Sequence, residues 1–79
     1  MNINFYCKKM YKSIGQNIRS YMTLGGMNIG RLARLTDTTP AYIRSIVYWD
    51  MRTKITLDLL LRISHALNVP LSKLVEERS

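Results

Sequence analysis

Apolar residues recur at helical spacing along most of the chain, and no segment shows the strict alternation typical of a strand. The first such pattern occupies positions i, i+4, i+7 and i+8 and consists of Ile14, Ile18, Tyr21 and Met22. Ser13 is an N-cap candidate at its start, and Gly25 and Gly26 follow its end, where glycine usually terminates a helix. The pattern predicts a helix over residues 13–24.

Two shorter helical patterns between Asn28 and Tyr48 are separated only by residues 36–38. Asn28 is the N-cap candidate of the first. Thr39 is the N-cap candidate of the second and is followed by Pro40, a residue favoured at the first helical position. The inward-facing apolar positions are Ile29, Leu32, Ala33 and Leu35 in the first helix and Ile43, Ile46 and Val47 in the second. Two helices joined by so short a turn cross steeply, so one of them can project from the domain toward a binding partner.

A fourth and a fifth helix follow. Thr56 is the N-cap candidate of the fourth helix, whose predicted core stripe comprises Leu57, Leu60, Leu61, Ser64 and Leu67. Asn68 suits a left-handed position at the end of this helix. Pro70 then interrupts the chain before a short fifth helix over residues 71–77.

The domain organisation follows from these patterns. Residues 1–12 show no clean period, so we expect a partly ordered N-terminal extension there, with at most an extra helical turn. Residues 13–79 form one domain with a modest core. The predicted fold class is all-α, a compact arrangement of five helices.

The positive charge of the chain is unevenly distributed. The formal net charge is +7, from 12 Lys and Arg residues against 5 Asp and Glu residues. Residues 1–54 carry nine of the basic side chains and only Asp37 and Asp50 as acids, whereas residues 55–79 carry three of each sign. This imbalance indicates a polyanionic partner, nucleic acid before a membrane surface.

Catalytic, metal-binding and membrane functions find little support in the sequence. Cys7 is the only cysteine, which excludes an intrachain disulfide and fits a reducing cytoplasm. His65 is the only histidine and has no second imidazole or acidic partner set, so we expect it to be structural. No apolar run approaches the roughly 18 residues that span a bilayer, and residues 1–12 show no signal-peptide cleavage site. We expect a cytoplasmic protein that is not an enzyme and needs no cofactor or metal.

The order and spacing of several segments resemble the lambdoid-repressor/Cro-type (XRE-like) helix-turn-helix family of small bacterial and phage transcriptional regulators. The segments that carry the resemblance are residues 13–19 (Ser-Ile-Gly-Gln-Asn-Ile-Arg), Leu32-Ala33, Thr38-Thr39, Tyr42-Ile43, Ile46 and residues 59–71 (Leu-Leu-Leu-Arg-Ile-Ser-His-Ala-Leu-Asn-Val-Pro-Leu). The resemblance covers residues 13–75. It implies a repressor-like domain that binds a double-stranded DNA operator and regulates transcription, with repression as the simplest mechanism.

The resemblance also implies which residues meet DNA. The positions that face the major groove and contact bases are Thr39, Pro40, Ala41, Arg44, Ser45 and Tyr48. The candidates for phosphate contact are Asn28, Thr38, Arg52 and Lys54, the first two at helix starts and the last two in the loop after the second motif helix. Tyr48 and Trp49 are also candidates for packing at the helix end. Lys8, Lys9 and Lys12 either enter a DNA groove as an arm or form a solvated tail.

Two departures from the family pattern affect the fold. The motif turn, which usually contains glycine, has Asp37 here, a residue that tolerates positive φ better than most. A buried Arg–Glu pair that is frequent in related repressors is replaced by Met22 and Val47. An apolar pair of suitable volume is often as stable as a buried ion pair, so we expect these two side chains to lie close together in the core.

A third departure affects recognition. Gln or Arg is common early in the second motif helix of the family, whereas this chain has Pro40 and Ala41. These residues offer only apolar contact, for example with a thymine methyl group. Arg44 therefore becomes the principal candidate for base recognition, with Ser45 and Thr39 as lesser ones.

The resemblance leaves the partners open beyond DNA. We expect a homodimer on two half-sites, joined through the fifth helix and exposed Leu71, Leu74 and Val75. One alternative is the antitoxin of a toxin–antitoxin pair, with a protein toxin as second partner. Another is a protein-interaction module that has kept the helical fold and lost DNA recognition, an alternative raised by Asp37, Pro40 and Ala41.

Overall fold

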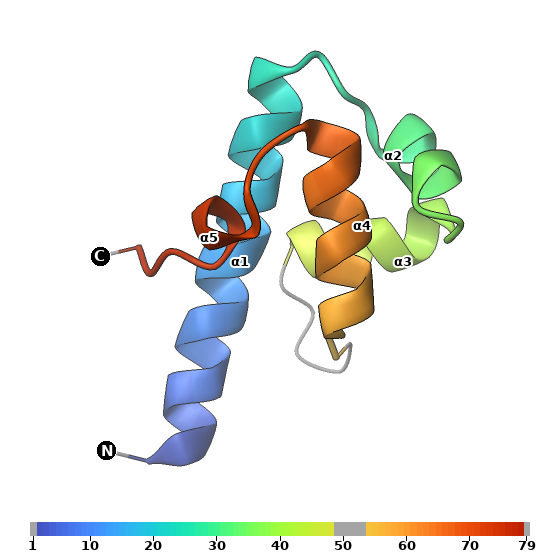
Figure 1. Cartoon of the computed structure of the whole chain (residues 1–79). Helices are drawn as coiled ribbons and strands as arrows, with labels where there is room; N and C mark the ends of the chain where they lie inside the picture. The colour runs from blue at the N-terminus through green and yellow to red at the C-terminus, as the bar shows by residue number, and fades with distance from the viewer. Residues whose placement is uncertain (1, 49–53, 79) are drawn as a thin grey trace.

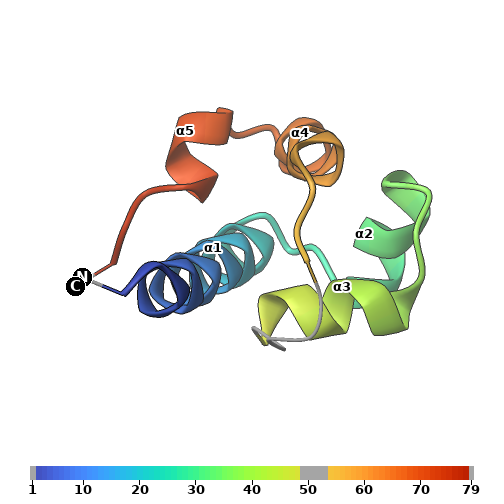
Figure 2. The same cartoon turned by 90° about the horizontal axis from the view of Figure 1, so that it is seen from below.

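The computed structural model describes residues 2–48 and 54–78, and within these ranges it contains five helices and no strand. The helices are α1 (Ile3–Leu24), α2 (Ile29–Leu35), α3 (Pro40–Val47), α4 (Leu57–Leu67) and α5 (Leu71–Leu74). The helix α4 lies between α5 and α2, and α1 runs along one side of the molecule (Figure 1 and Figure 2). This confirms the all-α, five-helix prediction. The expectations for Trp49 and Arg52 concern positions outside the described residues.

The helix α1 begins much earlier than the sequence patterns predicted. Asn2 is its N-cap, and the Asn2 Oδ1 accepts a hydrogen bond from the Asn4 amide at 2.8 Å. Ser13, the predicted cap, lies instead within the helix and is buried. The prediction was wrong because Asn2 supplies a cap and no glycine or proline interrupts the next twelve residues. The first turns of α1 extend past the rest of the described chain (Figure 1).

The core gathers side chains from all five helices. The apolar side chains that are at most 2% exposed are Ile18, Leu32, Ala33, Ile43, Ile46, Val47, Ile63 and Leu74. The predicted inward faces of α2 and α3 are present, except that Leu35 at the end of α2 is exposed and Ile29 is only half-buried. On α1, Ile14, Ile18 and Met22 are buried as predicted.

The predicted core stripe of α4 was partly wrong. Leu59, Leu60 and Ile63 are buried, whereas Leu57 and Leu61 are 63% and 49% exposed. The other two predicted core positions, Ser64 and Leu67, are half-buried. Leucines at four of the first five positions are compatible with more than one helical face. Packing of α4 against α1, α2 and α5 selects the face.

The chain after α5 packs against α1, an arrangement that the sequence analysis did not anticipate. The helix α5 ends at Leu74 rather than at residue 77. The buried amide of Asn17 donates to the carbonyls of Leu74 at 3.0 Å and Glu76 at 2.7 Å. Arg78 donates to the Asn17 Oδ1 at 2.5 Å, and its backbone amide donates to the Ser13 Oγ at 3.0 Å. The Leu74 side chain is fully buried in the apolar core, so the prediction that it is exposed for a dimer contact was wrong.

Candidate nucleic-acid interface

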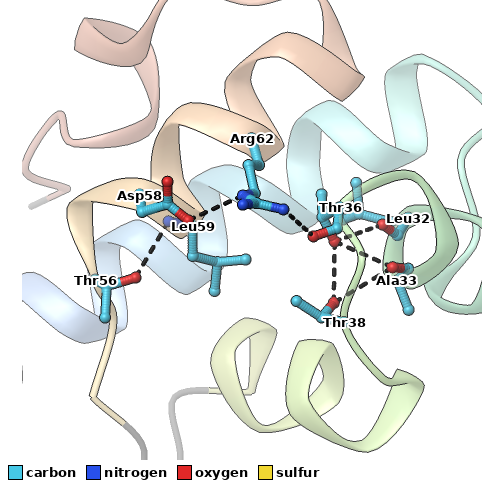
Figure 3. A network of polar contacts seen from close by, with 8 residues as sticks. All are labelled: Leu32, Ala33, Thr36, Thr38, Thr56, Asp58, Leu59 and Arg62. Atoms are coloured by element: carbon cyan, nitrogen blue, oxygen red, sulfur yellow. Dashed lines mark hydrogen bonds and ion pairs between the residues drawn. The ribbon is translucent and has the colours of Figure 1, made fainter.

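The turn between α2 and α3 is held by short-range hydrogen bonds. Asp37 has a φ of 57°, the left-handed conformation expected at this position. The Thr38 amide donates to the Ala33 carbonyl at 2.9 Å. The hydroxyl groups of Thr36 and Thr38 lie 2.9 Å apart (Figure 3). Arg62 on α4 donates to the Thr36 carbonyl at 3.4 Å. These bonds fix the direction in which α3 leaves the turn.

The start of α3 has the predicted cap. The Thr39 Oγ1 accepts a hydrogen bond from the Tyr42 amide at 3.2 Å, and Pro40 occupies the first turn. The inner face of the helix is anchored by Ile43, Ile46 and Val47, none more than 2% exposed. A helix held so firmly on one side presents a fixed opposite face to any partner.

The outward face of α3 carries the predicted base-contacting residues. Those exposed are Thr39, Pro40, Ala41, Arg44 and Tyr48. Among the described residues, the guanidinium group of Arg44 has no hydrogen bond or ion pair. Ser45 is half-buried, and its hydroxyl donates to the Tyr42 carbonyl at 2.7 Å within the same helix. Arg44 thus presents the strongest hydrogen-bond donor set on this face.

Tyr48 is joined to a residue that the sequence analysis gave no role. The Arg19 guanidinium carbon lies over the Tyr48 ring, 5.0 Å from its centroid. This distance is within the range of a cation–π interaction. Tyr48 remains 54% exposed, so the pair lies at the surface where α3 ends. No sequence signal indicates this contact, because the two residues lie far apart in the chain.

The predicted phosphate-contacting residues fall into different surroundings. Asn28 is exposed and caps α2, its Oδ1 accepting from the Arg31 amide at 2.8 Å. Thr38 is half-buried, with its hydroxyl bonded within the turn. Lys54 is exposed, and its carbonyl accepts from the Tyr42 hydroxyl at 3.2 Å, which ties α3 to the start of the segment before α4. Arg52 is not among the described residues.

Gly15 allows α1 and the end of α3 to approach closely. A Cβ atom at this position would lie 2.6 Å from the Ile46 carbonyl oxygen and 3.1 Å from that of Val47. Contacts under 3.0 Å require the backbone to shift, so only glycine fits here without rearrangement. The position of α3 relative to α1 therefore depends on this residue.

The predicted proximity of Met22 and Val47 is confirmed. Both side chains are buried, and both line one surface hollow of about 230 Å³ between α1, α2 and α3. The hollow also receives Arg19 and Tyr48. Two buried apolar side chains thus occupy the positions where the family resemblance implied an ion pair.

Other kinds of site are not assembled in the part of the chain that the structure describes. There, no group of three or more His, Cys, Asp or Glu residues is placed to hold a metal ion. Cys7 is a free, exposed thiol on α1. None of the described helices has both the length and the apolar content that crossing a membrane requires.

Comparison with known proteins agrees with this geometry. A family model described as helix-turn-helix matches residues 18–74. Two solved structures of the clp gene regulator ClgR from Corynebacterium glutamicum are similar, each 22% identical in sequence. One has a TM-score of 0.76 and covers 82% of this chain and 67% of its own; the other has a TM-score of 0.74 and covers 82% of each. No curated protein matches.

Proposed function

The chain belongs to the Cro/C1-type helix-turn-helix family of DNA-binding transcription regulators, and from this premise we propose that it recognises a specific double-stranded operator and represses transcription. Repression is the simplest mechanism for a domain of this kind, because a protein seated on a promoter excludes polymerase by occupying its site.

The observation that carries the proposal is the outward face of α3. Its inner face is fixed by Ile43 and Ile46, so the opposite side can enter a major groove without rearranging. Arg44 lies on that side, exposed and without a polar partner among the described residues. A guanidinium group in this position matches the two acceptors on the major-groove edge of guanine.

The flanking residues supply contacts that do not depend on base sequence. Asn28 and Lys54 are exposed beside α3, and Arg52 belongs to the same loop sequence as Lys54. Phosphate contacts of this kind fix the register of the protein on the duplex. Thr38 contributes mainly by holding the turn, because its hydroxyl group is already bonded there.

We further infer a homodimer on two half-sites about one helical turn apart, the usual arrangement for helix-turn-helix proteins. With Leu74 buried, Leu71 and Val75 are the remaining accessible positions of the predicted dimer contact. Light scattering of the protein alone and on a palindromic duplex tests the inference. A single copy on the palindrome at saturating protein would contradict it.

Selection from a library of random-sequence duplexes tests the main proposal. The selected duplex should bind about a thousandfold more tightly than a scrambled one in fluorescence anisotropy at physiological salt. Transcription in vitro from a promoter that overlaps the selected site should fall when the protein is added. Equal affinity for both duplexes would contradict sequence-specific recognition, and absence of any binding at low salt would favour a protein-interaction module.

A further inference from the structure

Three basic residues lie along one side of α1. In a helix of 3.6 residues per turn, Lys12 lies about 40° and Arg19 about 20° around the axis from Lys8. All three side chains are exposed, and α1 contains no acidic residue. We call Lys8, Lys12 and Arg19 the basic stripe.

The basic stripe borders the outward face of α3. Arg19 lies over the ring of Tyr48, a residue of that face. Gly15, which lies about 40° around α1 from Arg19, faces the carbonyl groups at the end of α3. The helices α1 and α3 also lie next to each other along one side of the molecule, with α4 and α5 on the other side (Figure 2). The basic stripe and the outward face of α3 are therefore parts of one continuous surface.

The length of the basic stripe suits a DNA strand. Lys8 and Arg19 are eleven positions apart, which corresponds to a rise of about 16 Å along the helix. One strand of B-DNA places a phosphate group at about every 3.4 Å of its axis, so the stripe spans several phosphates. Gly15 faces the end of α3, and Lys12 and Lys8 precede it on α1, so these lysines continue the basic surface along the helix away from that contact.

We propose that the basic stripe of α1 is a second surface for binding the DNA backbone, which contacts phosphate groups flanking the site where α3 enters the major groove. The proposal rests on the proposed function and adds to it a ligand for α1, the sugar–phosphate backbone outside the bases that α3 contacts. The sequence alone left these lysines as either an arm or a tail. A continuous helix gives them fixed spacing and a fixed direction.

Two other lysines provide a matched control. Lys9 lies about 100° around α1 from Lys8 and pairs with Glu77 at 2.6 Å. Lys73 on α5 pairs with Glu76 at 3.4 Å. Changing both to glutamine removes two positive charges, as many as changing Lys8 and Lys12, but from outside the basic stripe.

The experiment measures the affinity for the selected operator, extended by about ten base pairs on each side, as a function of salt concentration. In the Lys8→Gln/Lys12→Gln variant, the slope of log affinity against log salt should become less steep by about 2, because two phosphate contacts are lost. The Lys9→Gln/Lys73→Gln variant should keep nearly the wild-type slope. On a duplex trimmed to the half-sites, the difference between the two variants should disappear.

The outcomes separate the two proposals. If the wild-type protein binds the operator and both double variants change its slope equally, net charge alone is responsible and the basic stripe is overturned. Unchanged slopes in both variants would also overturn it, while leaving the proposed function intact. If the wild-type protein binds no duplex, both the proposed function and the proposed role of the basic stripe are contradicted. Circular dichroism of each variant confirms that the helices are retained.

Discussion

At the scale of single residues, solvent exposure and hydrogen bonding within the helix distinguish the side chains on the outward face of α3. Ser45 and Thr39 both take part in hydrogen bonds within their own helix, which restricts what they can offer to a base. Arg44 takes part in none within the described residues. Its outward direction was predictable, because Ile43 and Ile46 on the same helix define the opposite side.

Replacing Arg44 by alanine tests its assignment to a base. We expect the variant to lose about 1–3 kcal/mol of discrimination at one base pair of the operator, because a bidentate contact to guanine is removed. Anisotropy with a series of single-substitution duplexes measures the loss. The control is Lys73→Ala, which removes a charge from α5 on the other side of the fold. Equal weakening on every duplex would show that Arg44 contacts phosphate only.

Replacing Gly15 by alanine tests the close approach of α1 and α3. Alanine normally stabilises a helix interior relative to glycine by about 0.5–1 kcal/mol. Here the new Cβ atom would meet the Ile46 carbonyl at 2.6 Å, so we expect a net loss of about 1–3 kcal/mol in the free energy of unfolding. Urea denaturation gives the value. Gly30→Ala is the matched control, since its Cβ atom would meet only the Asn28 side chain at 3.6 Å; a similar loss in both variants would contradict the explanation.

At the scale of the elements, local signals predicted some helices well and others poorly. The starts of α2 and α3 follow from Asn28 and from Thr39 with Pro40, because a cap acts only on its own first turn. The inward face of α4 did not follow, since its leucine-rich sequence leaves the choice of face to packing. The contact between Arg19 and Tyr48 could not be predicted from the sequence either, because it depends on how two helices pack.

The turn between α2 and α3 provides a prediction at this scale. Asp37 adopts a φ of 57°, a conformation that glycine adopts without steric cost. We expect Asp37→Gly to stabilise the protein by about 0.5 kcal/mol, as measured by urea denaturation. Asp37→Asn removes the charge and keeps a side chain that tolerates the same φ, so it should change stability less. If the asparagine variant were the more stable, charge and not backbone conformation would limit the turn.

At the scale of the whole molecule, the segment after α5 completes the fold by attaching to α1. Asn17 is 4% exposed and is bonded to the carbonyls of Leu74 and Glu76 and to the Arg78 side chain. These partners lie more than fifty residues away in the chain, so no local pattern predicts them. The Leu74 side chain is buried in the apolar core, so only the other apolar positions of this region remain available to a second copy.

Replacing Asn17 by alanine tests this attachment. We expect a loss of about 2–3 kcal/mol in the free energy of unfolding, because the buried carbonyl of Leu74 and the partly buried carbonyl of Glu76 lose their donor. Lys9→Ala removes an exposed ion pair to the same segment and should cost less than about 1 kcal/mol. Denaturation midpoints distinguish the two variants. Equally small shifts would mean that the segment contributes little to stability.

The apolar character of the buried Met22 and Val47 side chains has a consequence for how the protein responds to salt. No ionisable group lies in that pair, so added electrolyte has little to weaken in this buried part of the boundary between α1 and α3. The complex with DNA, in contrast, loses affinity steeply as counterions accumulate. We expect a high salt concentration to dissociate the protein from its operator without unfolding it, so that lowering the salt concentration restores binding.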